Sequence, residues 1–453
     1  MQLIDGKSPV VVNTSDQASN LKTLLTAAAC SLLGTTAQAN EDNSWQFDTA
    51  LMYYGETDRV TAVEGIVAGS KEFQDEHFLN LKLTVDSLTG ASATGAVAQP
   101  NVQTFTRPSG EGIYQVAPGE TPLDDTFKDT RVQLNASWTQ PISENYSIST
   151  GAHLSKEYDY LSLGINGSIA RDFNKKNTTV AIGAGYFYDE IEPEGGIPRP
   201  LAQLPEIDFT QVSYEDDGEI EFEGDEIEFE DDEYNPYRIA SKDDKTTIDL
   251  LIGVTQVINR QMIMQLNYSY SQVDGYLTDP FKIVSVVDNN GISQHQIYEH
   301  RPDSRSKQSV FLQTKYHFSR NVLDFSYRYL WDDWEINSHT MDMRYRIPLG
   351  SGYIEPHVRY YMQEAAEFYR PFILTEQVMP EYVSADYRIG EMTALTVGFK
   401  YGLPLKNNQE ISFRIEYYQQ TPENPGYEEV GVLADLELFE SVEAIIAQIS
   451  YSF

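Results

Sequence analysis

The sequence predicts an all-β protein, a transmembrane antiparallel β-barrel of about sixteen strands. Three observations predict this fold. Beyond residue 39, no stretch approaches the ~20 consecutive apolar residues that a membrane-spanning helix requires. Apolar and polar residues instead alternate in runs of about 10 to 14 residues, as in a strand with one face toward lipid and one toward a polar interior. Short and long connections also alternate between successive runs, which is typical of outer-membrane barrels.

The last of these runs closes the chain as AQISYSF, in which every second residue is apolar. All the strands are expected at 45–57, 60–73, 77–89, 129–140, 145–157, 158–171, 177–189, 245–258, 261–272, 306–318, 321–332, 334–347, 352–364, 391–403, 409–420 and 442–453. An even number of strands is required if both chain ends lie on the periplasmic side. The final strand must close the barrel, and we expect Tyr451 and Phe453 to be the assembly signal for the barrel-insertion machinery.

The connections between the strands fall into two classes. Seven are short and rich in turn-forming residues: QDEH at 74–77, QPISEN at 140–145, NKKN at 174–177, INRQ at 258–261, SRN at 319–321, PLGSG at 348–352 and PLKNNQ at 404–409. Four are long, and each follows a strand that runs outward: 90–128, 190–244, 273–305 and 365–390. We therefore expect short periplasmic turns and long, acidic extracellular loops. A soluble β-sandwich would have no reason to separate loop lengths in this way.

The first 39 residues are expected to be a signal peptide. Lys22 precedes the apolar stretch LLTAAACSLLG, and the A-x-A sequence at 37–39 would release a mature barrel domain at 40–453. The part before Lys22 is long for such a signal, which leaves the true start codon open. Cys30 lies in the apolar core of the signal, and TAAAC is a poor match to the lipid-attachment sequence of a lipoprotein. These features predict export to the bacterial outer membrane.

The composition fits a membrane barrel and excludes other classes of protein. The chain contains 30 tyrosines and 20 phenylalanines, and amphipathic aromatic side chains gather at membrane interfaces. Its formal net charge is -37, and it has no basic patch for nucleic acid. Cys30 is the one cysteine, so the mature chain would hold no disulfide. We therefore expect outer-membrane lipid, and no nucleic acid, among its partners.

Charged residues on the faces opposite the apolar ones are expected to line the lumen, because a charge facing lipid at the bilayer midplane costs about 2 to 4 kcal/mol. The candidate lumen-lining charges are Asp324, Arg328, Asp342, Arg344, Arg346, Glu355, Arg359, Lys400, Arg414 and Glu416. Two interpretations remain open. Separate acidic and basic rows would set the ion preference of a pore. Charges paired on adjacent strands would instead cross-link the wall and help to block the lumen.

The segment 214–234 is the most acidic part of the chain, since 13 of the 19 residues from Glu215 to Glu233 are acidic. The candidate ligands for calcium or another divalent cation are Glu215, Asp216, Asp217, Asp225, Glu226, Asp231 and Asp232. Their spacing is not that of an EF-hand, and a solvated acidic loop or a protruding hairpin also explains them.

A second candidate segment, 274–305, carries acids, arginines and two histidines. If it folds into the barrel, its acids could face the arginines of the wall and form a constriction. His295 and His300, with Glu299 between them, could bind a transition metal, although unpaired loop histidines are the simpler interpretation.

Four longer stretches resemble a known family. They are LKLTVDSLTGAS (81–92), GETPLDDTFKDTRVQL (119–134), DGYLTDPFKIVSVVD (274–288) and YEHRPDSRSKQSVFLQTKYHF (298–318). Over about 45–453 the chain resembles the bacterial outer-membrane β-barrel family catalogued as domain of unknown function 3570. The resemblance implies a barrel with no established activity and no assigned catalytic residues. It also implies an envelope redox setting, because members are often encoded near a thioredoxin-like protein, a flavin-attaching enzyme and a small lipoprotein.

Three functions compete at this point. The first is a pore for small or cationic solutes, with the acidic loops concentrating cations at its mouth. The second is a plugged barrel that acts as a scaffold for a lipoprotein or a thioredoxin-like redox partner. An enzyme is not expected, because the seven histidines show no arrangement with a nucleophile and an orienting group.

Overall fold

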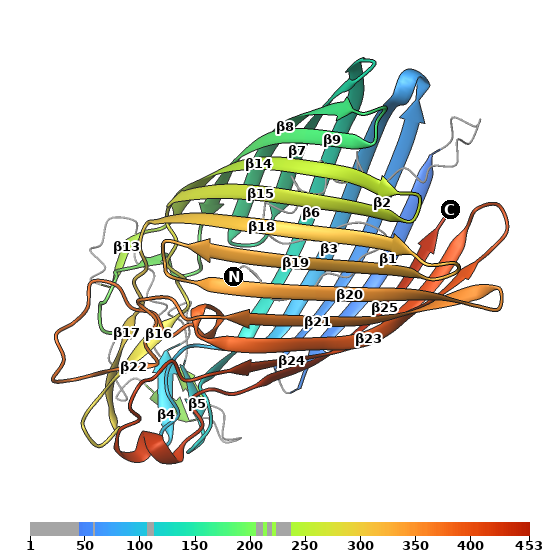
Figure 1. Ribbon diagram of the computed structural model, residues 1–453. Coiled ribbons are helices and arrows are strands. Elements are labelled where there is room, and N and C mark those ends of the chain that lie inside the picture. The colour runs from blue at the N-terminus through green and yellow to red at the C-terminus, as the bar shows by residue number, and fades with distance from the viewer. Residues whose placement is uncertain (1–44, 58, 107–112, 205–211, 215–219, 223–236) are drawn as a thin grey trace.

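The computed structural model describes residues 45–57, 59–106, 113–204, 212–214, 220–222 and 237–453. Sixteen strands form one closed antiparallel barrel, and a group of smaller strands lies at one end of it (Figure 1). The predicted all-β fold and the predicted number of barrel strands are confirmed. The proposed signal peptide, 1–39, lies outside the described residues and stays a prediction.

The barrel strands follow one another around the wall in chain order. They are β1 (Gln46–Glu56), β2 (Val60–Phe73), β3 (His77–Ala93), β6 (Leu123–Ser143), β7 (Tyr146–Lys156), β8 (Tyr160–Phe173), β9 (Thr178–Ile191), β14 (Asp243–Asn259), β15 (Met262–Gly275), β18 (Ser304–His317), β19 (Val322–Asp332), β20 (Asn337–Leu349), β21 (Gly352–Gln363), β23 (Met392–Pro404), β24 (Glu410–Pro422) and β25 (Val442–Ser452). Each predicted strand corresponds to one of them. The largest difference is that β3 and β6 both reach into the segment predicted as loop 90–128.

The outer surface of the barrel is apolar because successive side chains of a strand point to opposite faces. On β8, Leu163, Ile165 and Ile169 are 45%, 65% and 45% exposed, whereas Ser162 on the other face is buried. Strand β24 repeats the pattern with exposed Phe413 and Ile415. These outward rows form the lipid-facing belt of a transmembrane barrel. No helix within the described residues is long and apolar enough to cross a membrane.

Pairing of the first and last strands closes the barrel, with Asp48 opposite Ser452 and Glu56 opposite Ala444. At the end of this seam, the backbones of Phe47 and Phe453 exchange two hydrogen bonds of 2.7 and 2.9 Å. The Phe453 ring stacks on Phe47 at 5.5 Å and on Tyr451 at 5.1 Å. The chain therefore ends on an aromatic residue that is part of the closing strand pair.

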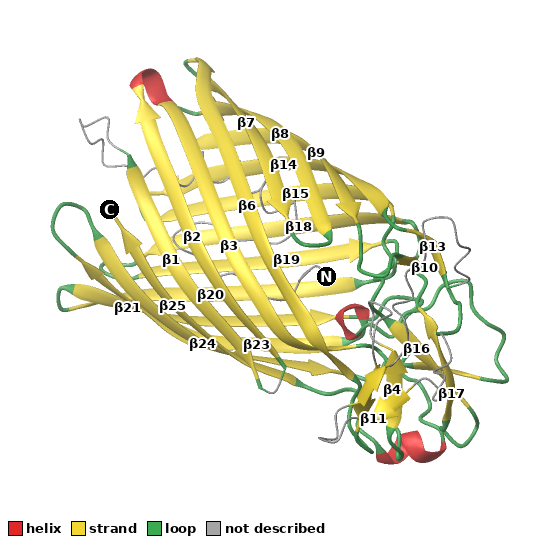
Figure 2. Cartoon of the chain, turned by 180° about the vertical axis from the view of Figure 1, so that it is seen from behind, coloured by secondary structure: helices red, strands yellow, loops and turns green. Residues whose placement is uncertain are grey.

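The two ends of the barrel differ in their connections. One end, the turn end, carries the seven predicted short turns, such as residues 350–351, where Gly350 adopts φ +60°. The opposite end, the loop end, carries the four predicted long connections (Figure 2). A fifth long connection, residues 423–441 between β24 and β25, was not among the predicted loops.

The described parts of the five long connections pack together into a cap at the loop end. Its strands are β4 (Gln103–Thr106), β5 (Ile113–Val116), β10 (Ile197–Pro198), β11 (Val212–Tyr214), β12 (Ile220–Phe222), β13 (Arg238–Ala240), β16 (Ile283–Val287), β17 (Ser293–Tyr298) and β22 (Phe372–Leu374). Strand β16 is buried along its length between β17 and β22. The Ile283 backbone N–H donates a hydrogen bond to the Thr94 carbonyl oxygen of another connection. The Asn290 carbonyl oxygen accepts one from the Val432 backbone N–H of the fifth. Val284 and Val286 of β16 pack with Ile373 and Val383, which gives the cap an apolar core of its own.

Candidate functional site

The predicted lumen-lining residues come together on one side of the barrel, on β19, β20, β21, β23 and β24. Cross-strand partners place them on the same face: Asp324 lies opposite Arg344, Asp342 opposite Arg359, and Glu355 opposite Lys400. The alternate residues of these strands, such as Met343 and Val358, are exposed on the outer surface. The ten predicted residues therefore form one luminal face, which we call the basic wall because six of them are basic.

Near the turn end, the basic wall is held together by ion pairs. Arg346 lies 3.8 Å from Glu355 and 3.9 Å from Glu410, and Lys400 lies 3.6 Å from Glu410. The ring of Tyr353 lies 3.5 Å from the Arg346 guanidinium carbon, and its hydroxyl donates a hydrogen bond of 2.6 Å to Glu410. These contacts make a cross-strand network of the kind that the structural interpretation predicted.

At the middle of the basic wall, His357 bridges two carboxylates. Its Nδ1 lies 2.8 Å from Glu416 Oε1 and its Nε2 lies 2.9 Å from Asp342 Oδ2. Both ring nitrogens can donate only when the imidazole is protonated, so this geometry suits an imidazolium. Arg344 and Arg414 lie 3.5 and 3.7 Å from the same two carboxylates. His357 alternates with Glu355 and Arg359 on β21 and so shares their face, but it was not counted among the predicted lumen-lining charges.

Acidic residues line the lumen on the opposite side, from β2 to β14. We call them the acidic band: Glu64, Asp86, Asp129, Glu157, Asp189 and Asp249. Glu64 lies directly opposite Asp86, and Asp86 accepts a hydrogen bond of 2.9 Å from Arg131. Arg131 also approaches Glu157 at 4.0 Å, and Lys245 approaches Asp189 at 4.0 Å. No residue on this side of the lumen was among the predicted site residues.

The cap contains a buried cluster of charges that joins two of its long connections. Arg301 binds Glu299 at 2.6 Å and Asp386 at 2.7 Å. Arg388 also binds Asp386, at 2.8 Å from its Nε, and forms a close ion pair with Asp279. Asp279 and Glu299 of the segment 274–305 therefore meet arginines of the cap, whereas a constriction of the barrel would have required its acids to face arginines of the wall.

The pKa values of the cap cluster follow from burial and from the neighbouring arginines. Burial opposes ionisation of Asp279, but Arg388, Lys282 and Arg301 outweigh it and lower its pKa to about 2. The pKa of Asp386 is also lowered, since Arg388 and Arg301 outweigh its burial. Burial raises the pKa of Glu299. The cluster is thus an ion network whose carboxylates at 279 and 386 stay charged in mild acid.

A turn of the cap reaches the rim of the barrel wall. The 3-10 turn η3 (Tyr387–Ile389) precedes Gly390, and the side-chain amide of Gln363 on β21 donates to Gly390 O at 2.8 Å and to Arg388 O at 3.1 Å. Arg59, beside β2, lies 5.7 Å from the ring centre of Tyr387. This turn covers part of the mouth of the lumen next to β21.

The predicted cation sites have different outcomes. Glu215, Asp216, Asp217, Asp225, Glu226, Asp231 and Asp232 lie outside the described residues. His295 lies on β17, whereas His300 follows that strand and its Nδ1 lies 2.7 Å from the Glu381 carbonyl oxygen. Within the described part of the chain, no three His, Cys, Asp or Glu side chains gather as ligands for a metal ion. A metal site in the loops remains a prediction.

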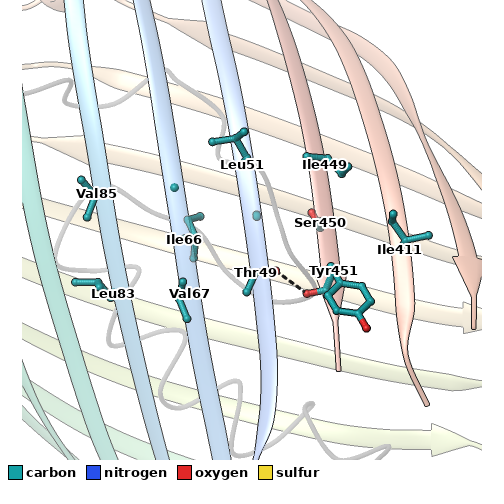
Figure 3. Close-up of a pocket in the computed structure, with 12 residues that line it drawn as sticks. Thr49, Leu51, Ile66, Val67, Leu83, Val85, Ile411, Ile449, Ser450 and Tyr451 are labelled. Atoms are coloured by element: carbon teal, nitrogen blue, oxygen red, sulfur yellow. Dashed lines mark hydrogen bonds between the residues drawn. The ribbon is translucent and has the colours of Figure 1, made fainter. Parts of the chain in front are cut away.

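A shallow apolar depression of about 480 Å³ lies on the lipid-facing side, beside the closing seam (Figure 3). Leu51, Val67, Val85 and Ile449 border it. It exists because Gly65, between Leu51 and Val85 in the ladder, has no side chain to fill the outer surface. Its apolar lining belongs to the lipid-facing belt and is separate from the charged lumen.

The fold and the charged lumen define a transmembrane β-barrel with a polar interior and a packed cap. The chain belongs to the family described as "Protein of unknown function (DUF3570)", which it matches over residues 22–453. No curated protein matches the sequence.

Several solved structures are similar to this barrel at low sequence identity. CdiB from Acinetobacter baumannii has a TM-score of 0.43 and 7% identity; the match covers 90% of this chain and 60% of CdiB, so the chain spans about 60% of that relative. The Pseudomonas putida toluene transporter TodX has a TM-score of 0.36 and 10% identity, with 91% and 89% covered. Pseudomonas aeruginosa OccK9 has a TM-score of 0.37 and 8% identity, with 91% and 98% covered.

Proposed function

We propose that the protein is a pore of the bacterial outer membrane for small polar solutes, with a preference for cations. One observation carries this proposal: the inward faces of the closed barrel carry charges on both sides, the basic wall and the acidic band, while the outward faces are apolar. Barrels of about sixteen strands are wide enough to hold an aqueous channel. A lining of fixed charges would select among the solutes that enter.

The orientation follows from the connections. Outer-membrane barrels place short turns in the periplasm and long loops outside. We therefore place the turn end in the periplasm and the cap on the cell surface, so that a solute meets the cap first and the acidic band next.

A swelling assay on proteoliposomes tests the pore directly. Protein purified from membranes is reconstituted, and the influx of glycine, a small amine salt and uncharged sugars of increasing size is followed by light scattering. The proposal predicts influx that falls with solute size and is faster for the amine than for an anion of similar size. Proteoliposomes that hold folded barrel and swell no faster than empty ones would contradict it.

A scaffold is the second candidate, and the cap favours it. On the surface of the cap, Val378 is 93% exposed and the adjacent Met379 is 41% exposed. A small lipoprotein held at the cell surface is the partner we propose for this surface. A photo-crosslinking residue at 378 should capture that partner in cells, whereas one at exposed Phe318 near the turn end should not. Equal capture at both positions, or at neither, would argue against a scaffold.

A further inference from the structure

The acidic band differs from the basic wall because several of its carboxylates lack hydrogen-bond partners. Among the described residues, Glu64 Oε1, Glu157 Oε2 and Asp189 Oδ1 accept no hydrogen bond of ordinary geometry, although the Asp129 carboxyl lies beside Glu157. Neither oxygen of Asp249 has a partner of ordinary geometry, although Ser271 lies directly opposite on β15. These four residues are only 5%, 7%, 3% and 0% exposed, in the order named.

The basic residues near the acidic band leave those oxygens unsatisfied. Arg131 binds Asp86 at 2.9 Å and reaches the other oxygen of Glu157 only at 4.0 Å. Lys245 reaches Asp189 through Oδ2, at 4.0 Å. Lys82 and Lys307 are the further basic neighbours, of Glu64 and Asp249 respectively. Counted over the part of the chain that the structure describes, the band therefore has six acids against four basic residues, whereas the acids of the basic wall already face arginines, lysines and His357.

The acidic band is continuous and lies in the half of the barrel nearer the cap. Glu64 is four residues after the start of β2 at the loop end, and Asp189 is two residues before the end of β9 there. Cross-strand pairing joins Glu64 to Asp86, and Asp86 to Arg131. A solute that has passed the cap reaches these carboxylates before it reaches the ion pairs near the turn end.

A buried carboxylate oxygen without a donor is costly, and in native structures such a group commonly marks an ion or a ligand. A ligand for one of these carboxylates must supply a positive charge and N–H donors to its oxygens. A compact metal ion fits poorly, because no three such ligands converge within the described residues. A guanidinium or primary ammonium group carries several N–H donors on one charge.

We propose that the acidic band is a binding site for small organic cations with N–H donors, in particular a primary ammonium or guanidinium group. The inference rests on the proposed pore for the route by which the cation arrives. Glu64 on β2 and Asp249 on β14 lie at the two ends of the band, six strand spacings apart, so each accepts hydrogen bonds from a cation of its own.

Calorimetry on barrel purified from membranes in detergent tests the site without requiring conduction. Guanidinium and methylammonium, at millimolar concentration, should bind, whereas tetramethylammonium, which has the same charge but no N–H donor, should not. The double variant Glu64→Gln with Asp249→Asn should bind guanidinium at least about ten-fold more weakly, since hydrogen bonds to charged groups are lost. The control Glu72→Gln with Glu76→Gln removes the same charge near the turn end and should bind as the natural protein does.

Two results would overturn the site: equal binding of tetramethylammonium and guanidinium, or unchanged affinity in the double variant. Folding of each variant is checked by its heat-dependent shift on a gel, and Glu64→Gln alone replaces the double variant if that one does not fold. A barrel that binds guanidinium but does not mediate swelling would contradict the proposed pore and support the proposed cation site. A barrel that mediates swelling but binds no guanidinium would contradict the proposed cation site and support the proposed pore.

Discussion

His357 carries a contact that holds three strands of the lumen together, since it joins β21 to Asp342 on β20 and to Glu416 on β24. Replacing it by leucine leaves the two carboxylates without their shared donor. We expect His357→Leu to lower the free energy of unfolding by about 3 kcal/mol, a typical cost of removing one partner of a buried ion pair. Urea unfolding in lipid vesicles measures this free energy, and His317→Leu, at an exposed position, is the control. Equal stability of the two variants would contradict the bridge.

Two strand glycines make a matched pair for testing the geometry of the wall. A Cβ added at Gly65 would meet only the Val85 carbonyl oxygen at 3.8 Å, within the outer depression. At Gly398 it would collide with the Ile415 carbonyl oxygen and the Glu416 backbone. We expect Gly65→Ala to raise the free energy of unfolding by about 0.5 kcal/mol and Gly398→Ala to lower it by about 1 to 3 kcal/mol. Similar values from the same urea titrations would show that the strand register is wrong.

At the scale of elements, the cap should loosen in acid before the barrel does. The pKa of Asp279 is about 2 in the folded cap against an ordinary 3.8, because Arg388, Lys282 and Arg301 outweigh the burial that opposes its charge. A carboxyl whose pKa is lowered by folding stabilises the folded state at pH values above its ordinary pKa. This stabilisation is lost as the pH falls through the folded-state pKa. Hydrogen exchange of the cap should therefore accelerate between about pH 4 and pH 2.

The variant Asp279→Asn supplies the control for that acid response. It removes the charge while keeping an oxygen for the Phe281 backbone N–H. We expect fast cap exchange already at neutral pH, with little further change in acid, whereas Glu376→Gln, at an exposed cap position, should behave as the natural protein does. An acid response that survives in Asp279→Asn would show that another group controls the cap.

The barrel strands could be predicted because their signal is local: period-2 alternation and turn residues lie within about 14 residues of one another. The cap could not, since β16 pairs in parallel with β22, some 85 residues further along the chain. The same limit explains which parts of the candidate site could be predicted from the sequence. The basic wall was visible as charges within single strands, but the link of His357 to Glu416 and the continuity of the acidic band depend on pairing between strands.

At the scale of the whole molecule, closure between the first and last strands is the feature on which the fold depends. Ala50 and Ser450 are direct partners across that seam. The natural chain has Cys30 as its one cysteine, so cysteines introduced at 50 and 450 are the only thiols of the strands. We expect them to cross-link on mild oxidation and to prevent the heat-dependent shift on a gel. The pair at 50 and 449, whose side chains face opposite sides of the wall, should not cross-link; equal cross-linking would contradict the register.

Single-channel recording in a planar bilayer tests the proposed pore most directly. Protein purified from membranes is inserted, and currents are recorded in potassium chloride gradients with calcium and with a chelator. Steady, cation-selective openings are the predicted result, with the selectivity reduced in the variant that neutralises Glu64 and Asp249. Silence under both conditions, from protein shown to be folded, would contradict the pore and leave the cap and its partners as the site of function.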